Sequence, residues 1–214
     1  VEGGERSEVD GRCGRGARLT SRSDIGALLG LEHQTMAHNL ITQLGYTTRQ
    51  AHHYEQTLNR ELKQPAETRW DSAKSRIRSA GDALVKCLLF SGEAKLTAET
   101  RGDPAFADHF LKDGPRDSQG RSLRTFDLKS RLFQYPCSYL VHSDAFSQLP
   151  DEGRDYVLRR IHEILTAEKL PSDFQHLAAC DRPAMMQIIR ETVPRLPPCW
   201  EMPPQSDAPS DAAE

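Results

Sequence analysis

The feature that most constrains this fold is the helical spacing of apolar residues across positions 24–62. Placed at intervals of ~100°, one set of residues shares a single helix face: Leu29, Met36, Leu40, Leu44, Ala51, Tyr54, Leu58 and Leu62. A straight helix over these positions would extend about 58 Å, because each residue adds ~1.5 Å. A compact domain of this size has a radius of gyration of only ~17 Å. We therefore expect the helix to break between Gly45 and Thr48.

Six further segments have helical spacing or helix-capping signals. They cover residues 67–90, 102–114, 122–133, 136–146, 149–169 and 180–193. The segment 122–133 must end before Pro136, which in turn suits the first turn of the following helix. Alternation with a period of two residues, which is typical of strands, is scarce. The sequence thus predicts an all-α fold, an irregular bundle of about six or seven helices.

The two ends of the chain differ in composition from the part between them. Residues 1–22 are rich in Gly, Arg and acidic side chains, and residues 201–214 are polar and rich in Pro. Segments with so little apolar surface cannot offset the entropy lost on ordering, so we expect both ends to be disordered. One helical domain over residues 23–200 remains, and it is long enough to bury a sizeable core.

Charge and hydropathy argue against two classes of protein. The 214 residues carry a formal net charge of −3, whereas a general nucleic-acid-binding surface is cationic. No apolar run approaches the length of about 18 residues that a membrane span needs. The five cysteines show no CxxC, CxxCH or zinc-finger spacing, and Cys87 and Cys137 lie in apolar runs that predict burial. The sequence does not decide whether Cys180 and Cys199 form a disulfide.

Three histidines are candidate ligands of a metal or haem inside the bundle. His33 lies within the apolar stripe of the first helix, where a buried imidazole needs a polar partner. One interpretation is a hydrogen-bonded core histidine. The other is a ligand that shares an ion or haem with His142 or His162 from other helices, with Glu32 as a further candidate. The sequence does not specify the cofactor.

The stretch "RLFQYPCSYLVHSDAF", residues 131–146, holds candidates for nucleophilic catalysis. Ser138 and His142 are four residues apart and would face each other on a helix, as a nucleophile and its base do. Cys137 and His142 are five apart and would diverge. No GxSxG turn surrounds Ser138, and the neighbouring apolar residues indicate a packed segment. We therefore predict a structural role and assign no catalytic residue.

A basic turn is a candidate binding surface. Between residues 112 and 131, six basic side chains outnumber three acidic ones. Arg116, Arg121 and Arg124 lie near an expected helix start, where free backbone N–H groups also favour anions. A carboxylate, a phosphate or an acidic partner would fit; alternatively, internal ion pairs with Asp117 fasten the loop. A second candidate surface is one flank of the first helix, with polar residues at intervals of seven: Glu32, Asn39, Tyr46 and His53.

Three stretches carry a resemblance to a known group of proteins: "SDIGALLGLEHQTMAHNLIT", "GPRDSQGRSLRTFDLKSRLFQYPCSYLVHSDAF" and "DRPAMMQIIRETVPRLPPCW". They resemble the C-terminal region of uncharacterised exported bacterial proteins of planctomycete type, over most of residues 22–200. The resemblance implies a periplasmic or secreted location and a neighbourhood of c-type cytochrome functions. It transfers no redox role to any residue here, because the chain has no haem-attachment motif.

These observations lead to two hypotheses about function. The first is a non-catalytic helical binding or scaffold domain of a larger exported bacterial protein, whose partner is another protein or an upstream domain of the same polypeptide. The alternative is a metal- or haem-associated, redox-linked helical protein that uses the histidines named above.

Overall fold

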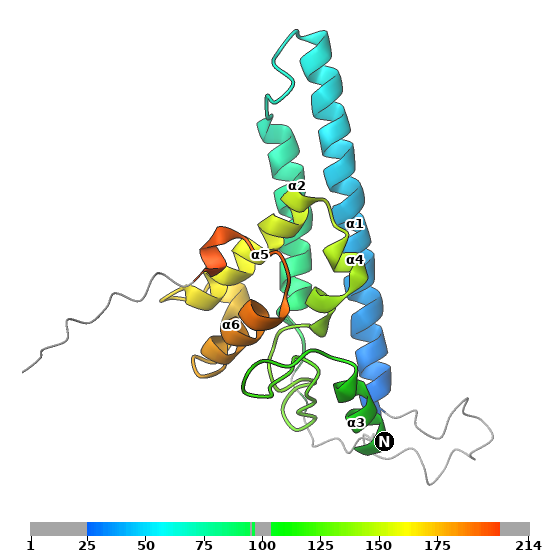
Figure 1. The fold of residues 1–214 in the computed structure, drawn as a ribbon, viewed down its shortest axis with the longest axis vertical. Helices are drawn as coiled ribbons and strands as arrows, with labels where there is room; N and C mark the ends of the chain where they lie inside the picture. Colours follow the sequence, from blue (N-terminus) through cyan, green and yellow to red (C-terminus); the bar gives the residue numbers. More distant parts are fainter. Residues whose placement is uncertain (1–24, 95, 97–103, 202–214) are drawn as a thin grey trace, which may run out of the picture.

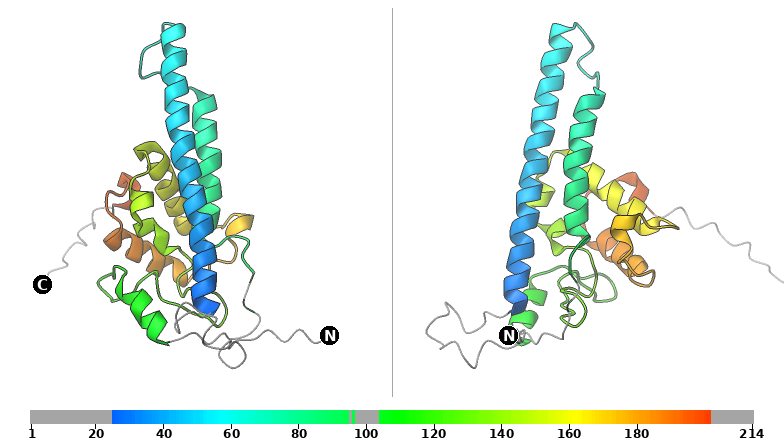
Figure 2. Two further views of the ribbon diagram at one scale, coloured as in Figure 1. Left: turned by 90° about the vertical axis from the view of Figure 1, so that its right-hand side faces the viewer. Right: turned by 180° about the vertical axis from the view of Figure 1, so that it is seen from behind.

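The computed structural model describes residues 25–94, 96 and 104–201. Two antiparallel helices, α1 (Ile25–Glu61) and α2 (Asp71–Leu88), form a long hairpin. The other elements pack against the half of the hairpin that holds the start of α1 and the end of α2 (Figures 1 and 2). They are the helices α3 (Pro104–Lys112), α4 (Asp144–Ser147), α5 (Asp151–Thr166) and α6 (Asp181–Thr192), and the 3₁₀ turns η2 (Tyr139–His142), η3 (Ser172–Phe174) and η4 (Pro198–Trp200).

The prediction of an all-α fold is confirmed. The described residues contain six α-helices and no strand; a single isolated bridge joins Phe126 and Phe133. None of the helices in this part of the chain is both long and apolar enough to cross a bilayer. The predicted disordered ends, residues 1–22 and 201–214, lie outside the described residues except for Glu201.

The predicted break in α1 is wrong, because the helix runs through Gly45 and Thr48 without interruption. The Thr48 hydroxyl donates to the Leu44 carbonyl, 2.8 Å away, and so needs no partner outside the helix. The far end of α1 does not stand alone either. Buried Glu55 accepts hydrogen bonds from the Trp70 backbone N–H and from Arg69, which fastens the connection to α2.

The buried face of α1 is rotated relative to the predicted one. Met36 and Tyr54, predicted to be inside, are exposed, and Leu62 is exposed beyond the end of the helix. Leu44 and Ala51 are buried as predicted. Several polar residues share the buried face, and a hydrophobicity pattern cannot place them: His33, Thr48, Glu55 and Asn59.

Two glycines allow α5 to approach the hairpin closely. A Cβ atom added at Gly81 of α2 would lie 2.4 Å from the ring of Tyr156, and one at Gly153 would lie 2.8 Å from the Thr48 hydroxyl. The Tyr156 hydroxyl also donates to the Asp82 carboxylate, 2.7 Å away. Beyond α5, α6 packs on its outer side, and fully buried Trp200 of η4 donates from its indole N–H to the Leu158 carbonyl.

The predicted helix over residues 122–133 is wrong. The segment folds into turns because Asp127 accepts hydrogen bonds from the Ser130 backbone, the Ser130 hydroxyl and the Arg131 backbone. Such local bonds compete with a helix. The turn brings the rings of Phe126 and Phe133 to a stacked separation of 5.1 Å, and Phe133 is buried. The whole stretch from Asp113 to Ser138 is irregular.

The predicted helix over residues 136–146 is divided into η2 and α4. Ser138 accepts a hydrogen bond from the Leu140 backbone N–H, and Ser143 accepts one from Phe146. Each serine therefore starts its own short turn, as N-capping side chains do. The predicted helices over 102–114, 149–169 and 180–193 are present as α3, α5 and α6.

Candidate functional site: a polar pocket around Arg124

A small polar pocket lies where α1, α3, the irregular segment and η2 meet. Its volume is about 260 Å³. It is lined by Gln34, His38, Phe110, Arg124, Tyr139, Leu140, His142 and Ser143. Gln34 and His38 are one turn apart on α1, so both point toward the same side. The pocket is therefore built from segments that are more than 100 residues apart in the chain.

Arg124 is the only arginine or lysine among these lining residues, and it is held firmly. Its guanidinium lies 4.9 Å from the ring centroid of Phe110 and 4.9 Å from that of Tyr139. It also donates to the Phe110 carbonyl at 3.3 Å, and its stem passes against Gly114. No carboxylate among the described residues forms an ion pair with it. A rigid, unneutralised cation that lines a pocket favours an anion.

His142 faces the pocket in a defined tautomer. Its Nε2 lies 2.8 Å from the Thr192 hydroxyl, which donates its own hydrogen to the Ile188 carbonyl. The hydroxyl must therefore accept from His142, so Nε2 carries the proton of the neutral ring. Nδ1 is buried and has no hydrogen-bond partner among the described residues. Burial and the charge of Arg124 lower the pKa of His142 to about 4, and the Tyr139 carbonyl opposes this only in part.

Tyr139 joins the two sides of the pocket. Its hydroxyl donates to the Gln34 side-chain oxygen at 3.1 Å, which links η2 to α1. Burial raises the pKa of Tyr139, although the nearby Arg124 acts in the opposite direction, so the hydroxyl stays protonated and remains a donor. The edge of its ring also meets Phe110, with centroids 5.1 Å apart. These contacts hold the walls in place without a ligand.

A second group, of buried His33 and Ser138 with exposed Glu93, lies beside the pocket. His33 Nε2 is 2.8 Å from the Ser138 hydroxyl, and His33 Nδ1 is 3.5 Å from a Glu93 carboxylate oxygen. The order of groups matches that of a hydrolase triad. However, Ser138 is 0 % exposed, and Phe90 stacks on the imidazole at 4.4 Å. No substrate carbonyl can reach this serine, and the group serves to satisfy a buried histidine.

The pairing that the sequence suggested in this segment is not formed. Ser138 bonds to His33 rather than to His142, which bonds to Thr192. Cys137 is completely buried, as predicted, and burial raises the pKa of its thiol to about 12. Cys87 is also buried, whereas Cys180 and Cys199 are free, exposed thiols. Cys13 lies outside the described residues.

The three candidate arginines separate into two roles. Arg116 is exposed and donates to the Gly120 carbonyl within its own turn. Arg121 forms an ion pair with buried Asp117 at 2.6 Å and a hydrogen bond to Gln187 of α6. These contacts lie within the turn or join it to α6. Arg124 alone lines the pocket.

The three candidate metal ligands have three different surroundings. His33 is paired with Ser138, His142 with Thr192, and His162 lies edge-on to Trp200 at 5.2 Å. Within residues 25–94, 96 and 104–201, no group of three or more His, Cys, Asp or Glu side chains is arranged to hold a metal ion. The histidines do not converge on one point.

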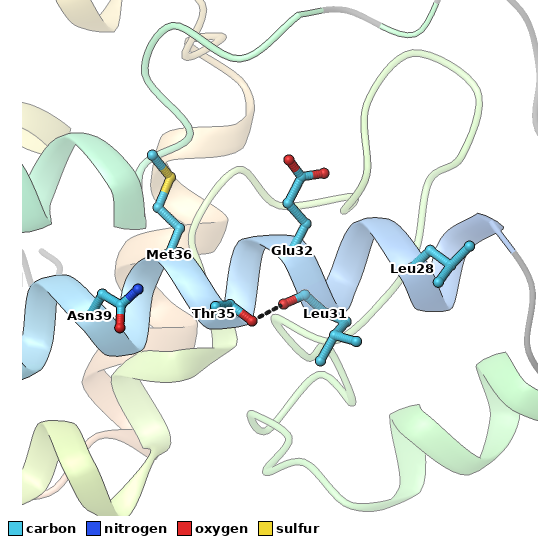
Figure 3. A pocket seen from close by; sticks show the side chains of 6 residues that line it. All are labelled: Leu28, Leu31, Glu32, Thr35, Met36 and Asn39. Carbon is cyan, nitrogen blue, oxygen red and sulfur yellow. Dashed lines mark hydrogen bonds between the residues drawn. The ribbon is translucent and has the colours of Figure 1, made fainter.

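The polar flank of α1 faces outward. Glu32 and Asn39 border a wide, shallow hollow of about 570 Å³ together with Leu28, Leu31, Thr35 and Met36 (Figure 3). All six side chains come from the same helix, and the Thr35 hydroxyl donates back to the Leu31 carbonyl. Tyr46 and His53 are exposed farther along the helix. The hollow has one wall only and holds no converging polar groups.

Sequence reasoning found Arg124 and His142 but assigned them to different sites. It missed Gln34, Phe110 and Tyr139 as lining residues. No sequence spacing predicts that these residues meet, because they approach one another only through the irregular segment.

Comparison with known proteins found no relative: no family model, curated protein or solved structure matches this chain significantly.

Proposed function

We propose that this chain is a non-catalytic helical binding domain that captures a small organic anion in the pocket around Arg124. The observation that carries the proposal is the guanidinium itself, which is fixed between two aromatic rings and has no carboxylate partner among the described residues. The other lining residues include both hydrogen-bonding side chains and apolar ones. A carboxylate that bears an apolar or weakly polar body suits such walls.

The pocket offers no set of groups for covalent chemistry. The Ser143 hydroxyl donates to the Leu140 carbonyl and accepts from the Phe146 backbone N–H. It therefore has no free base beside it, which a serine nucleophile requires. His142 Nε2 is used by Thr192. These bonds support binding rather than catalysis.

A titration with simple anions tests the proposal. We expect benzoate to cause saturable shifts in the NMR resonances of Tyr139 and His142, with acetate binding more weakly because it has less apolar surface. Arg124→Gln should abolish the shifts, while Arg116→Gln removes an exposed arginine of the same region and should leave them intact. Equal binding to the Arg124→Gln variant, or no saturable shift with benzoate, acetate or inorganic phosphate, would overturn the proposal.

The wider setting of the domain follows from the resemblance alone. We propose a periplasmic or secreted location and a partner that is another protein or an upstream domain of the same polypeptide. Fractionation of the native host, followed by detection of the chain, tests the location. Recovery in the cytoplasmic fraction would refute it. The metal or haem alternative is not proposed, since no contact of His33, His142 or His162 favours it.

A further inference from the structure

We propose that the pocket takes up its anion together with one proton, which binds to Nδ1 of His142. The inference rests on the proposed function and concerns the regulation of the same site. Its basis is that Arg124 and His142 line one small cavity. An anion that enters this cavity lies close to both.

The hydrogen bonds leave only one place for the proton. Nε2 of His142 already donates to Thr192, because the Thr192 hydrogen is committed to the Ile188 carbonyl. Nδ1 is buried without a partner among the described residues, near the Tyr139 carbonyl. When protonated, Nδ1 becomes a donor that the Tyr139 backbone can satisfy, and the anion in the cavity offsets the charge of the ring without touching this buried atom.

The charges around His142 explain why the proton needs the anion. Arg124 approaches from the irregular segment, His38 from α1, and Tyr139 from η2 itself; Phe110 of α3 and Thr192 of α6 are uncharged. No acidic side chain is among the lining residues. An imidazolium would therefore stand beside Arg124 with no compensating charge, and the anion supplies that charge.

Linkage then fixes the direction of the pH effect. In the free protein the pKa of His142 is about 4, and a neighbouring anion shifts it toward the ordinary value of 6.5. The complex thus holds more protons than the free protein between these two values, so affinity rises as pH falls. Binding should be tighter at about pH 5.5 than at about pH 7.5, by up to about tenfold, the value for a pKa that returns fully to the ordinary one.

The test uses benzoate and benzenesulfonate as probes, because the sulfonate keeps its charge over the whole range. Dissociation constants are measured by calorimetry at both pH values, in buffers of different ionisation enthalpy, so that proton uptake is counted directly. We expect proton uptake at the lower pH with both probes. His142→Gln keeps a donor for Thr192 but cannot be protonated, so the ratio of its dissociation constants at the two pH values should fall to about one, whatever its affinity at pH 7.5.

Controls separate this inference from the proposed function. His38→Gln removes the other histidine of the pocket and should preserve the pH dependence. NMR titration of His142 in the wild-type protein gives its pKa with and without the probe, so the result does not rely on the folding of a variant. Saturable binding with an unchanged His142 pKa, or pH dependence that disappears in His38→Gln, would refute proton coupling alone. Loss of all binding would instead refute the proposed function.

Discussion

Gly81→Ala is a sharp test of how α2 and α5 pack. Alanine is favoured over glycine inside a helix by ~1 kcal/mol, so substitution at an open helical position is stabilising. At Gly81 the new methyl group would lie 2.4 Å and 2.7 Å from two ring carbons of Tyr156. Atoms cannot remain at that separation, and the ring or the α5 backbone must move. The clash and the helix preference therefore act in opposite directions.

The size of the clash decides the sign of the change. Overpacking in a well-packed interior costs about 1–3 kcal/mol. A displaced Tyr156 ring also weakens the hydrogen bond from its hydroxyl to Asp82, a contribution of ~1 kcal/mol. After the ~1 kcal/mol gained from helix preference is subtracted, the free energy of unfolding should fall by about 1–3 kcal/mol. Urea denaturation followed by circular dichroism measures this change.

Two matched variants make the test specific. Gly30→Ala lies in α1, where an added Cβ meets no atom within 4 Å, and should stabilise the protein by about 0.5–1 kcal/mol. In a Tyr156→Ala background the obstacle is gone, so Gly81→Ala should change sign and become stabilising. Should Gly81→Ala stabilise the wild-type protein as much as Gly30→Ala does, the close approach of α2 and α5 is incorrect.

Two further predictions concern the buried groups beside the pocket. Ser138→Ala leaves His33 Nε2 buried without its partner and removes the cap of η2, so the free energy of unfolding should fall by about 1–3 kcal/mol. Ser147→Ala, at a more open position, is the control. Equal effects of the two substitutions on the free energy of unfolding would contradict the role assigned to the bond between Ser138 and His33. In peptide-resolved alkylation of the folded protein, the exposed Cys180 and Cys199 should react while Cys87 and Cys137 do not. Burial blocks access to the last two thiols and raises the pKa of Cys87 to about 11 and that of Cys137 to about 12. Reaction of Cys137 at the rate of Cys180 would refute its burial.

The helices were predictable where periodicity and local signals agree. In α5, apolar residues recur on one side and acidic residues occupy the first turn, so pattern and end signal give the same bounds. α3 has proline in its first turn, as the sequence indicated. In α1 the pattern gave the helix but not its buried face. Small and polar residues such as Ala37 and Asn59 are also buried there. Asn59 is satisfied by bonds to the connection before α2, at Ala66, Thr68 and Trp70, and hydrophobicity carries no information on such bonds.

The length of α1 was misjudged for a different reason. The argument for a break compared one helix with the radius of a sphere, but the structure is elongated along its hairpin (Figures 1 and 2). The distal part of α1 needs only α2 beside it, together with the bonds that join Glu55 of α1, Arg69 of the connection to α2, and Glu152 of α5. Polar bonds at long sequence separation thus replace apolar contacts, and no local pattern records them.

The largest error in the helix prediction and the proposed site lie in the same segment. Apolar spacing predicted a helix over 122–133. In such a helix, the position of Arg124 would be set by the helical repeat. Asp127 and its hydrogen bonds to Ser130 and Arg131 prevent that helix. The chain instead carries Arg124 between Phe110 and Tyr139. A departure from local preference is expected where a site requires it, so the failure of the pattern here is itself an argument for the Arg124 pocket.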